Sequence, residues 1–182
     1  MKHYSVVTLK DGRSCVIRNG VREDGEMVRD VFILTHEQTD YMLTYPDECT
    51  MSAESEGEFL QKRTEEKDGI ELVAVVDDRI VGTAGFSAVG RFEKIRRRAE
   101  FGVGVDSAYW GLGIGCALTE TCIELSKQAG YSQLELDVVA DNIAALSLYK
   151  KLGFSEYGRN PKGFYSRYSG WQELVLMRLE LH

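Results

Sequence analysis

The segment YWGLGIG, residues 109–115, places three glycines at alternate positions directly before a predicted helix that runs to Gln128. Residues 99–105 predict a short strand, so the glycines join a strand to a helix start. Glycine lets the backbone approach an anion closely, and the first N–H groups of a helix are unpaired and partly positive. The segment therefore predicts a phosphate or pyrophosphate site, with a tight turn that needs left-handed residues as the structural alternative.

Two common phosphate-binding motifs do not fit this segment. The dinucleotide fingerprint GxGxxG needs a third glycine where this chain has Cys116 or Leu118, and a Walker A loop needs Lys and Ser or Thr after Gly115. Glu135 nevertheless follows Gly115 by 20 residues (135 − 115), where a ribose-binding acid would lie. A bound dinucleotide stays open on this evidence.

A second informative segment is the predicted helix 142–152, which follows a predicted strand at 133–139. Asn142 and Tyr149 are two helical turns apart, so they share a face on which Ala145 lies between them. An amide and a phenol on one face could line a ligand groove. The alternatives are an Asn that caps the helix and a Tyr that packs into the core.

The remaining pattern predicts an α/β (α+β) fold with a mixed sheet in a single domain, residues 1–182. Asp11-Gly12 predicts a type I′ hairpin turn between two short strands. Antiparallel neighbours come early and a βαβ unit comes late, in the order ββααβββαβαββ. The other predicted elements are helices at 26–36 and 52–66, and strands at 70–76, 80–89, 154–157 and 171–181.

Together the two segments resemble the GNAT superfamily of acyl-CoA-dependent N-acyltransferases, over about residues 70–181. That family has a strand, a short link and [Q/R]xxGxG, matched by the strand residues Val103–Val105 and by Gly113-Ile114-Gly115. Trp110 stands in the Gln/Arg position, which removes one side-chain contact to the pyrophosphate. The second part of the signature is NxxAxxxY followed by Gly-Phe, matched by Asn142, Ala145, Tyr149, Gly153 and Phe154.

The resemblance implies a mixed central sheet flanked by helices, acetyl-CoA as cosubstrate and no metal. The central strand would part from its neighbour, backbone groups would pair with the pantetheine arm, and helix-start amides would hold the pyrophosphate. Asn142 would touch the pantetheine. The residues that it assigns to cofactor binding are Val103, Gly104, Val105, Gly111, Leu112, Gly113, Ile114, Gly115, Cys116, Asn142, Ala145 and Tyr149.

The implied reaction, direct attack of an amine on the thioester, poses two proton problems. An alkyl amine near pKa 10.4 must lose its proton, at a cost of about 4–5 kcal/mol at pH 7, which a general base lowers. Glu100 is the first candidate base and Asp137 the second, with an exposed carboxylate or an ion pair to the basic run 94–98 as the alternative. Tyr149 would protonate the leaving thiolate.

Composition excludes several other classes. The chain has 22 Lys and Arg against 29 Asp and Glu, a net charge of −7, which argues against nucleic-acid and anionic-membrane partners. The longest apolar run, Leu72–Val76, is too short to span a membrane, and the start lacks a signal peptide. Four cysteines without a CxxC pair are typical of a reduced, cytoplasmic protein. Three scattered histidines form no metal pattern.

The acceptor is predicted from two loops. In the family that the sequence resembles, the segment between the first two helices overhangs the acceptor site. Residues 37–60 hold seven acids and no Lys or Arg, so this acidic lip would favour a cationic acceptor such as a polyamine, aminoglycoside or basic amino acid; acids that complement a helix dipole are the alternative. The loop expected at 158–170 carries Lys162 and Arg167, which could instead grip a carboxylate. The sequence thus predicts a small-molecule primary amine. A protein or peptide acceptor, a non-catalytic acyl-CoA sensor and a homodimer stay open.

Overall fold

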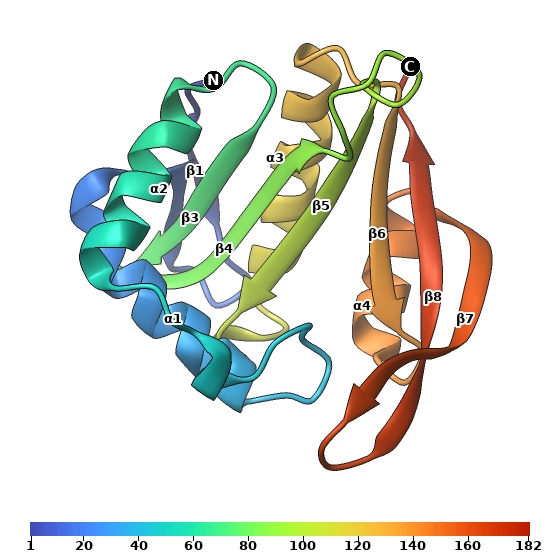
Figure 1. Ribbon diagram of the computed structural model, residues 1–182. Helices are drawn as coiled ribbons and strands as arrows, with labels where there is room; N and C mark the ends of the chain where they lie inside the picture. Colours follow the sequence, from blue (N-terminus) through green and yellow to red (C-terminus); the bar gives the residue numbers. More distant parts are fainter.

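One eight-stranded sheet organises the chain, which a computed structural model describes over residues 1–182. Its strand order is β1-β2-β3-β4-β5-β6-β8-β7, and only β5 and β6 are parallel neighbours (Figure 1). The predicted order of elements and the mixed sheet are confirmed. The strands are β1 (Tyr4–Thr8), β2 (Ser14–Asn19), β3 (Ile70–Val76), β4 (Arg79–Ala88), β5 (Arg98–Val105), β6 (Gln133–Val139), β7 (Ser155–Ser166) and β8 (Gly170–Glu180).

Two pairs of helices cover the two faces of this sheet (Figure 1). The helices are α1 (Gly25–Glu37), α2 (Ala53–Glu65), α3 (Ile114–Gln128) and α4 (Ile143–Lys151). α1 and α2 pack Val28, Val31 and Leu60 on Val73 and Ile80. The larger core lies under α3 and α4 on the other face. None of the helices has the length and apolar character needed to cross a membrane.

α3 illustrates how the sequence pattern produces this packing. Its predicted apolar stripe, Ile114, Leu118, Cys122 and Leu125, is buried in the larger core. Full burial of one such aliphatic side chain contributes about 1.5–3 kcal/mol. The helix ends before Gly130, whose φ of +85° is the left-handed conformation that a residue after a helix commonly adopts.

The expected type I′ geometry of the Asp11-Gly12 turn is wrong. The hairpin at residues 10–13 forms, but only Gly12 has a positive φ, whereas a type I′ turn needs two such residues. The β3–β4 turn has both, at Asp77 (+49°) and Asp78 (+60°). Asp tolerates the left-handed region because its short polar side chain can hydrogen-bond locally.

The expected loop 158–170 is also wrong, because β7 continues to Ser166 and pairs with β8. The ladder is irregular between Asn160 and Phe164, where Pro161 lies. Proline lacks an N–H, so strands admit it at edges and bulges. This proline and the polar residues near it conceal the strand pattern in the sequence.

β5 and β6 separate after three residue pairs. Their parallel ladder joins residues 98–100 to 133–135 and then ends. Beyond it, β5 stays paired with β4 through Val105, and β6 stays paired with β8 through Val139. Figure 1 shows the two strands diverging towards their C-terminal ends. The expected parting of the central strand is therefore confirmed.

Candidate active site

The glycine segment forms a cradle of free amides at the end of β5. Gly111 and Gly113 have φ of +77° and +102°, and Gly113 is the N-cap of α3. A Cβ added at either position would meet no protein atom within 4 Å. The N–H groups from Gly111 to Cys116 donate to no acceptor within the protein. The turn does need left-handed glycines, and its free amides can also bind an anion.

Trp110 has a structural partner beside this cradle. Its indole Nε1 donates to the carbonyl of Val105 at 2.6 Å. The ring therefore fastens the link to the end of β5, and one backbone group of Val105 is already bonded. The amide cradle keeps its donors, because none of them takes part in this contact.

Tyr149 and Asn142 lie on α4 as the spacing predicts, and both also show the structural roles considered as alternatives. Tyr149 is 8% exposed and packs against Phe101 and Phe154 with ring centroids 6.4 and 5.7 Å away. Its hydroxyl makes no hydrogen bond within the protein and is not fully buried. Burial of the side chain raises the pKa of Tyr149 to about 12. Asn142 Oδ1 caps the helix by accepting from the N–H of Ala145 at 3.2 Å, which leaves the Asn142 Nδ2 group free.

The two candidate bases lie on the sheet face that α1 and α2 cover. Their neighbours along the strands are buried in the core on the opposite face, while Glu100 on β5 and Asp137 on β6 are exposed. Burial, with a contribution from Glu135, raises the pKa of Asp137. Glu100 belongs to the last pair of the β5–β6 ladder, opposite Glu135, whereas Asp137 lies two residues beyond this pair on β6.

Glu135 forms an ion pair with Arg98, so its carboxylate is not free to bind a ribose. Arg98 donates to both of its carboxylate oxygens, at 2.6 and 2.7 Å. Glu135 is thus held across the β5–β6 ladder. The basic run 94–98 supplies this ion pair through Arg98 and makes none with Glu100 or Asp137.

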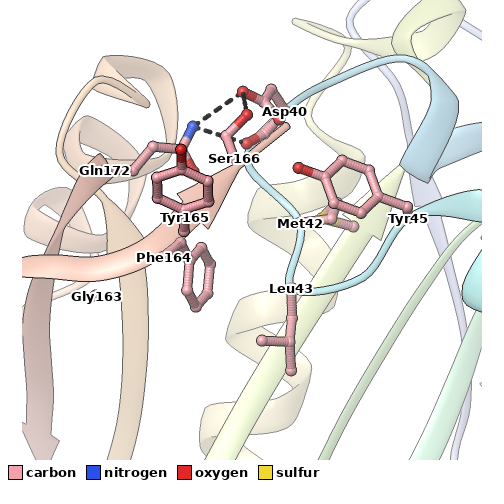
Figure 2. A pocket seen from close by; sticks show the side chains of 9 residues that line it. All are labelled: Asp40, Met42, Leu43, Tyr45, Gly163, Phe164, Tyr165, Ser166 and Gln172. Atoms are coloured by element: carbon pink, nitrogen blue, oxygen red, sulfur yellow. Dashed lines mark hydrogen bonds between the residues drawn. The ribbon is translucent and has the colours of Figure 1, made fainter. Parts of the chain in front are cut away.

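A pocket of about 190 Å³ lies between the loop after α1 and the β7–β8 hairpin (Figure 2). Phe164 of the hairpin and Leu43 of the loop stand on opposite walls, with Tyr45 beside them. Met42, Leu43, Tyr45, Phe164 and Tyr165 give it apolar walls, while Asp40, Ser166 and Gln172 add polar groups. The lining residues are Asp40, Met42, Leu43, Tyr45, Gly163, Phe164, Tyr165, Ser166 and Gln172.

Two of the seven acids in residues 37–60, Asp40 and Asp47, hold the hairpin. Asp40 Oδ2 accepts from Ser166 and Gln172 at 2.6 and 3.1 Å (Figure 2), and from Ser169 at 2.9 Å. Asp47 accepts two hydrogen bonds from Arg167, at 2.8 and 2.9 Å. Arg167 is therefore not the mobile cation that the sequence suggested.

Glu71 is a carboxylate that the sequence reasoning missed. It lies within the apolar strand IELVAVV of β3, where a single acid among buried residues was the available signal. The side chain is partly buried. Burial raises the pKa of Glu71 to about 7, with the Arg63 charge lowering it and Glu56 raising it.

Comparison with known proteins agrees with this geometry. The profile of the acetyltransferase (GNAT) family matches residues 32–154. [Ribosomal protein bS18]-alanine N-acetyltransferase of Escherichia coli is 35% identical over 81 residues, 44% of this chain and 54% of that protein. L-amino acid N-acetyltransferase of E. coli is 34% identical over 104 residues, 56% of this chain and 64% of that protein. The chain thus spans under two thirds of the length of either relative. An acetyltransferase from Salmonella typhimurium, solved with its cofactor acetyl-CoA, has the same fold, with a TM-score of 0.82, 21% identity and coverage of 92% of this chain and 94% of that one.

Proposed function

The chain belongs to the acetyltransferase (GNAT) family, and we propose that it transfers the acetyl group of acetyl-CoA to the primary amine of a small molecule. The observation that carries the proposal is the parting of β5 from β6 directly beside the free amides of residues 111–116. An extended arm can lie in the opening while its phosphates reach the amides. The acetyl-CoA in the Salmonella structure of the same fold supports this choice of donor.

The residues present fit acetyl-CoA, which supplies an activated acetyl group. The left-handed glycines leave space where side chains would otherwise project into the cradle. Backbone groups of residues 103–105, on the β5 edge that has no partner strand, would hold the pantetheine arm. On α4, the free Nδ2 group of Asn142 would contact the same arm, with Ala145 leaving room beside it.

In the reaction, the amine nitrogen attacks the acetyl carbonyl carbon, so an N–C bond forms and the C–S bond breaks. Tyr149 gives its proton to the departing sulfur and regains one from solvent, and its pKa of about 12 keeps it protonated at neutral pH between turnovers. A carboxylate takes the amine proton. Glu100 and Asp137, on the face that α1 and α2 cover, are the candidates for that role from the sequence.

The pocket between Leu43 and Phe164 favours an acceptor whose amine carries an apolar group, as many amino acids do. Asp40 and Asp47 already hold hydrogen bonds from the hairpin, so they attract a polycation less than free carboxylates would. The E. coli L-amino acid N-acetyltransferase supports this acceptor class. The bS18-alanine relative supports an alternative, a protein N-terminus with a small first residue.

The test is thiol release from acetyl-CoA against amino acids, polyamines, aminoglycosides and short peptides, with product masses recorded. An acetylated amino acid or other small amine is the expected product. Acetylation of peptides alone would replace the small molecule with a protein acceptor. No product from any acceptor, despite tight acetyl-CoA binding in the same samples, would point to a sensor and overturn the proposed activity.

A further inference from the structure

A row of one glutamate and two glycines crosses three strands of the sheet. In the antiparallel ladders, Glu71 of β3 is opposite Gly85 of β4, and Gly85 is opposite Gly102 of β5. All three lie on the face that α1 and α2 cover, because the flanking residues Leu72 and Phe101 belong to the core on the other face. Glu71 therefore has nothing but backbone beside it in the direction of β5.

The Glu71 carboxylate occupies the first part of this row. A Cβ built on Gly85 would collide with Glu71 Oε2, which places the carboxylate directly over the Gly85 backbone. A Cβ built on Gly102 would meet no atom within 4 Å. The two glycines thus have different uses, since one makes room for the acid and the other leaves open space next to it.

The open end of the row lies at the site where the strands part. The β5–β6 ladder ends at the pair Glu100–Glu135, and Gly102 comes two residues later. Neighbouring strands are about 4.7–4.9 Å apart. The carboxylate over Gly85 is therefore about one strand spacing from the backbone that borders the opening, which is enough for one bridging water.

The charged groups around Glu71 leave it free to exchange a proton. Glu56 and Arg63 face it from α2, Glu100 lies on the same sheet face, and the Cys122 thiol lies across the sheet. Arg63 is engaged elsewhere, donating to Glu66 and to the carbonyl of Phe86. No ion pair or hydrogen bond holds the Glu71 carboxylate, so it loses only the longer-range attraction of Arg63 when it takes a proton.

We propose that Glu71 is the proton acceptor for the amine, through a water held over Gly85 and Gly102. The proposal rests on the proposed function. As the N–C bond forms, the amine N–H proton moves to the water, one water proton moves to Glu71 Oε2, and Glu71 releases it to solvent after the amide leaves. The pKa of about 7 that burial gives this carboxyl suits a base at neutral pH.

The first test is Glu71→Gln, which keeps the size of the side chain and removes the base. We expect kcat/KM to fall by about 10²-fold or more at pH 8, with the acetyl-CoA Kd and the Tm of the wild type retained. At saturating amine, the wild-type kcat should rise with pH through about pH 7, and the variant should lack this rise. Glu56→Gln is the matched control, and it should keep the rate at pH 8 while moving the rise to lower pH, because it removes a like charge.

A second variant blocks the row without touching the acid. Gly102→Ala adds a methyl group to an extended position that has space for it, so the protein should keep its stability, while the methyl group displaces the water and lowers kcat. A wild-type pH profile and rate in Glu71→Gln would overturn the proposal. So would an equal loss of rate in Glu56→Gln, because it would point to a general effect of charge under α2.

The outcome can be separated from that of the proposed function. A ¹³C NMR titration of the glutamate carboxyls, compared with Glu71→Gln, reads the pKa of Glu71 without any turnover. A resonance that titrates near 7, with active wild type and an impaired variant, supports the base. If the wild type is active and Glu71→Gln keeps the wild-type rate, the role of Glu71 is overturned and the proposed function stands. A wild type that acetylates no acceptor overturns both proposals.

Discussion

Replacing Tyr149 with Phe tests the acid role in the proposed reaction. The substitution removes one hydroxyl and keeps the ring that packs against Phe101 and Phe154. Because that hydroxyl makes no hydrogen bond within the protein, we expect the free energy of unfolding to change by less than about 0.5 kcal/mol. The thiolate that leaves has a pKa near 8.5 and partly leaves unaided, so kcat should fall by about 10²-fold, the low end for acid catalysis.

The assay is steady-state thiol release at saturating acceptor, with the acetyl-CoA Kd measured by calorimetry. Tyr131→Phe is the matched control, since its hydroxyl donates to the carbonyl of Asp68 at 2.6 Å, away from α4. The control should lose about 0.5–1.5 kcal/mol of stability, a fall in Tm of a few degrees, and keep kcat. An unchanged kcat in Tyr149→Phe would refute the role, and a loss of acetyl-CoA affinity without a loss of kcat would make Tyr149 a binding residue.

Three further outcomes follow from other contacts. Asp24→Asn breaks the pair with Arg18, in which Asp24 is 4% exposed, and should cost about 3 kcal/mol in urea unfolding at pH 7. Burial raises the pKa of Asp24, but the hydrogen bonds from Arg18 and from the Val21 N–H, together with the Arg18 charge, outweigh burial and leave the pKa below its ordinary value of 3.8. The stabilisation is therefore full above pH 3.8 and is lost as pH falls through the lower folded pKa, and equal stability of the two chains at pH 7 would contradict it. Gly113→Ala and Gly130→Ala strain equivalent left-handed positions by about 1–2 kcal/mol each, yet only Gly113→Ala should weaken acetyl-CoA binding in calorimetry. Arg167→Ala should raise KM for the acceptor and leave the acetyl-CoA Kd unchanged, and the reverse pattern would remove the hairpin from the acceptor site.

Local patterns in the sequence were sufficient for the elements and for the amide cradle before α3. The stripe Ile114, Leu118, Cys122 and Leu125 indicated α3, and the alternating glycines indicated its N-terminal amides, because both depend on residues close together in the chain. The same locality explains a failure. Asp11-Gly12 has the composition of a type I′ turn, but the strands that it joins selected another geometry.

The acceptor side depended on contacts between distant residues. Asp47 and Arg167 are 120 positions apart, and only the fold shows that they neutralise each other. Glu71 reads as an odd residue in an apolar strand until the ladder registers place two glycines beside it. The sequence alone thus determined the order of elements and the amide cradle, which arise from backbone preferences of neighbouring residues. The tertiary structure decided which charges remain free and where the carboxylates face, because strand register and loop packing set those distances.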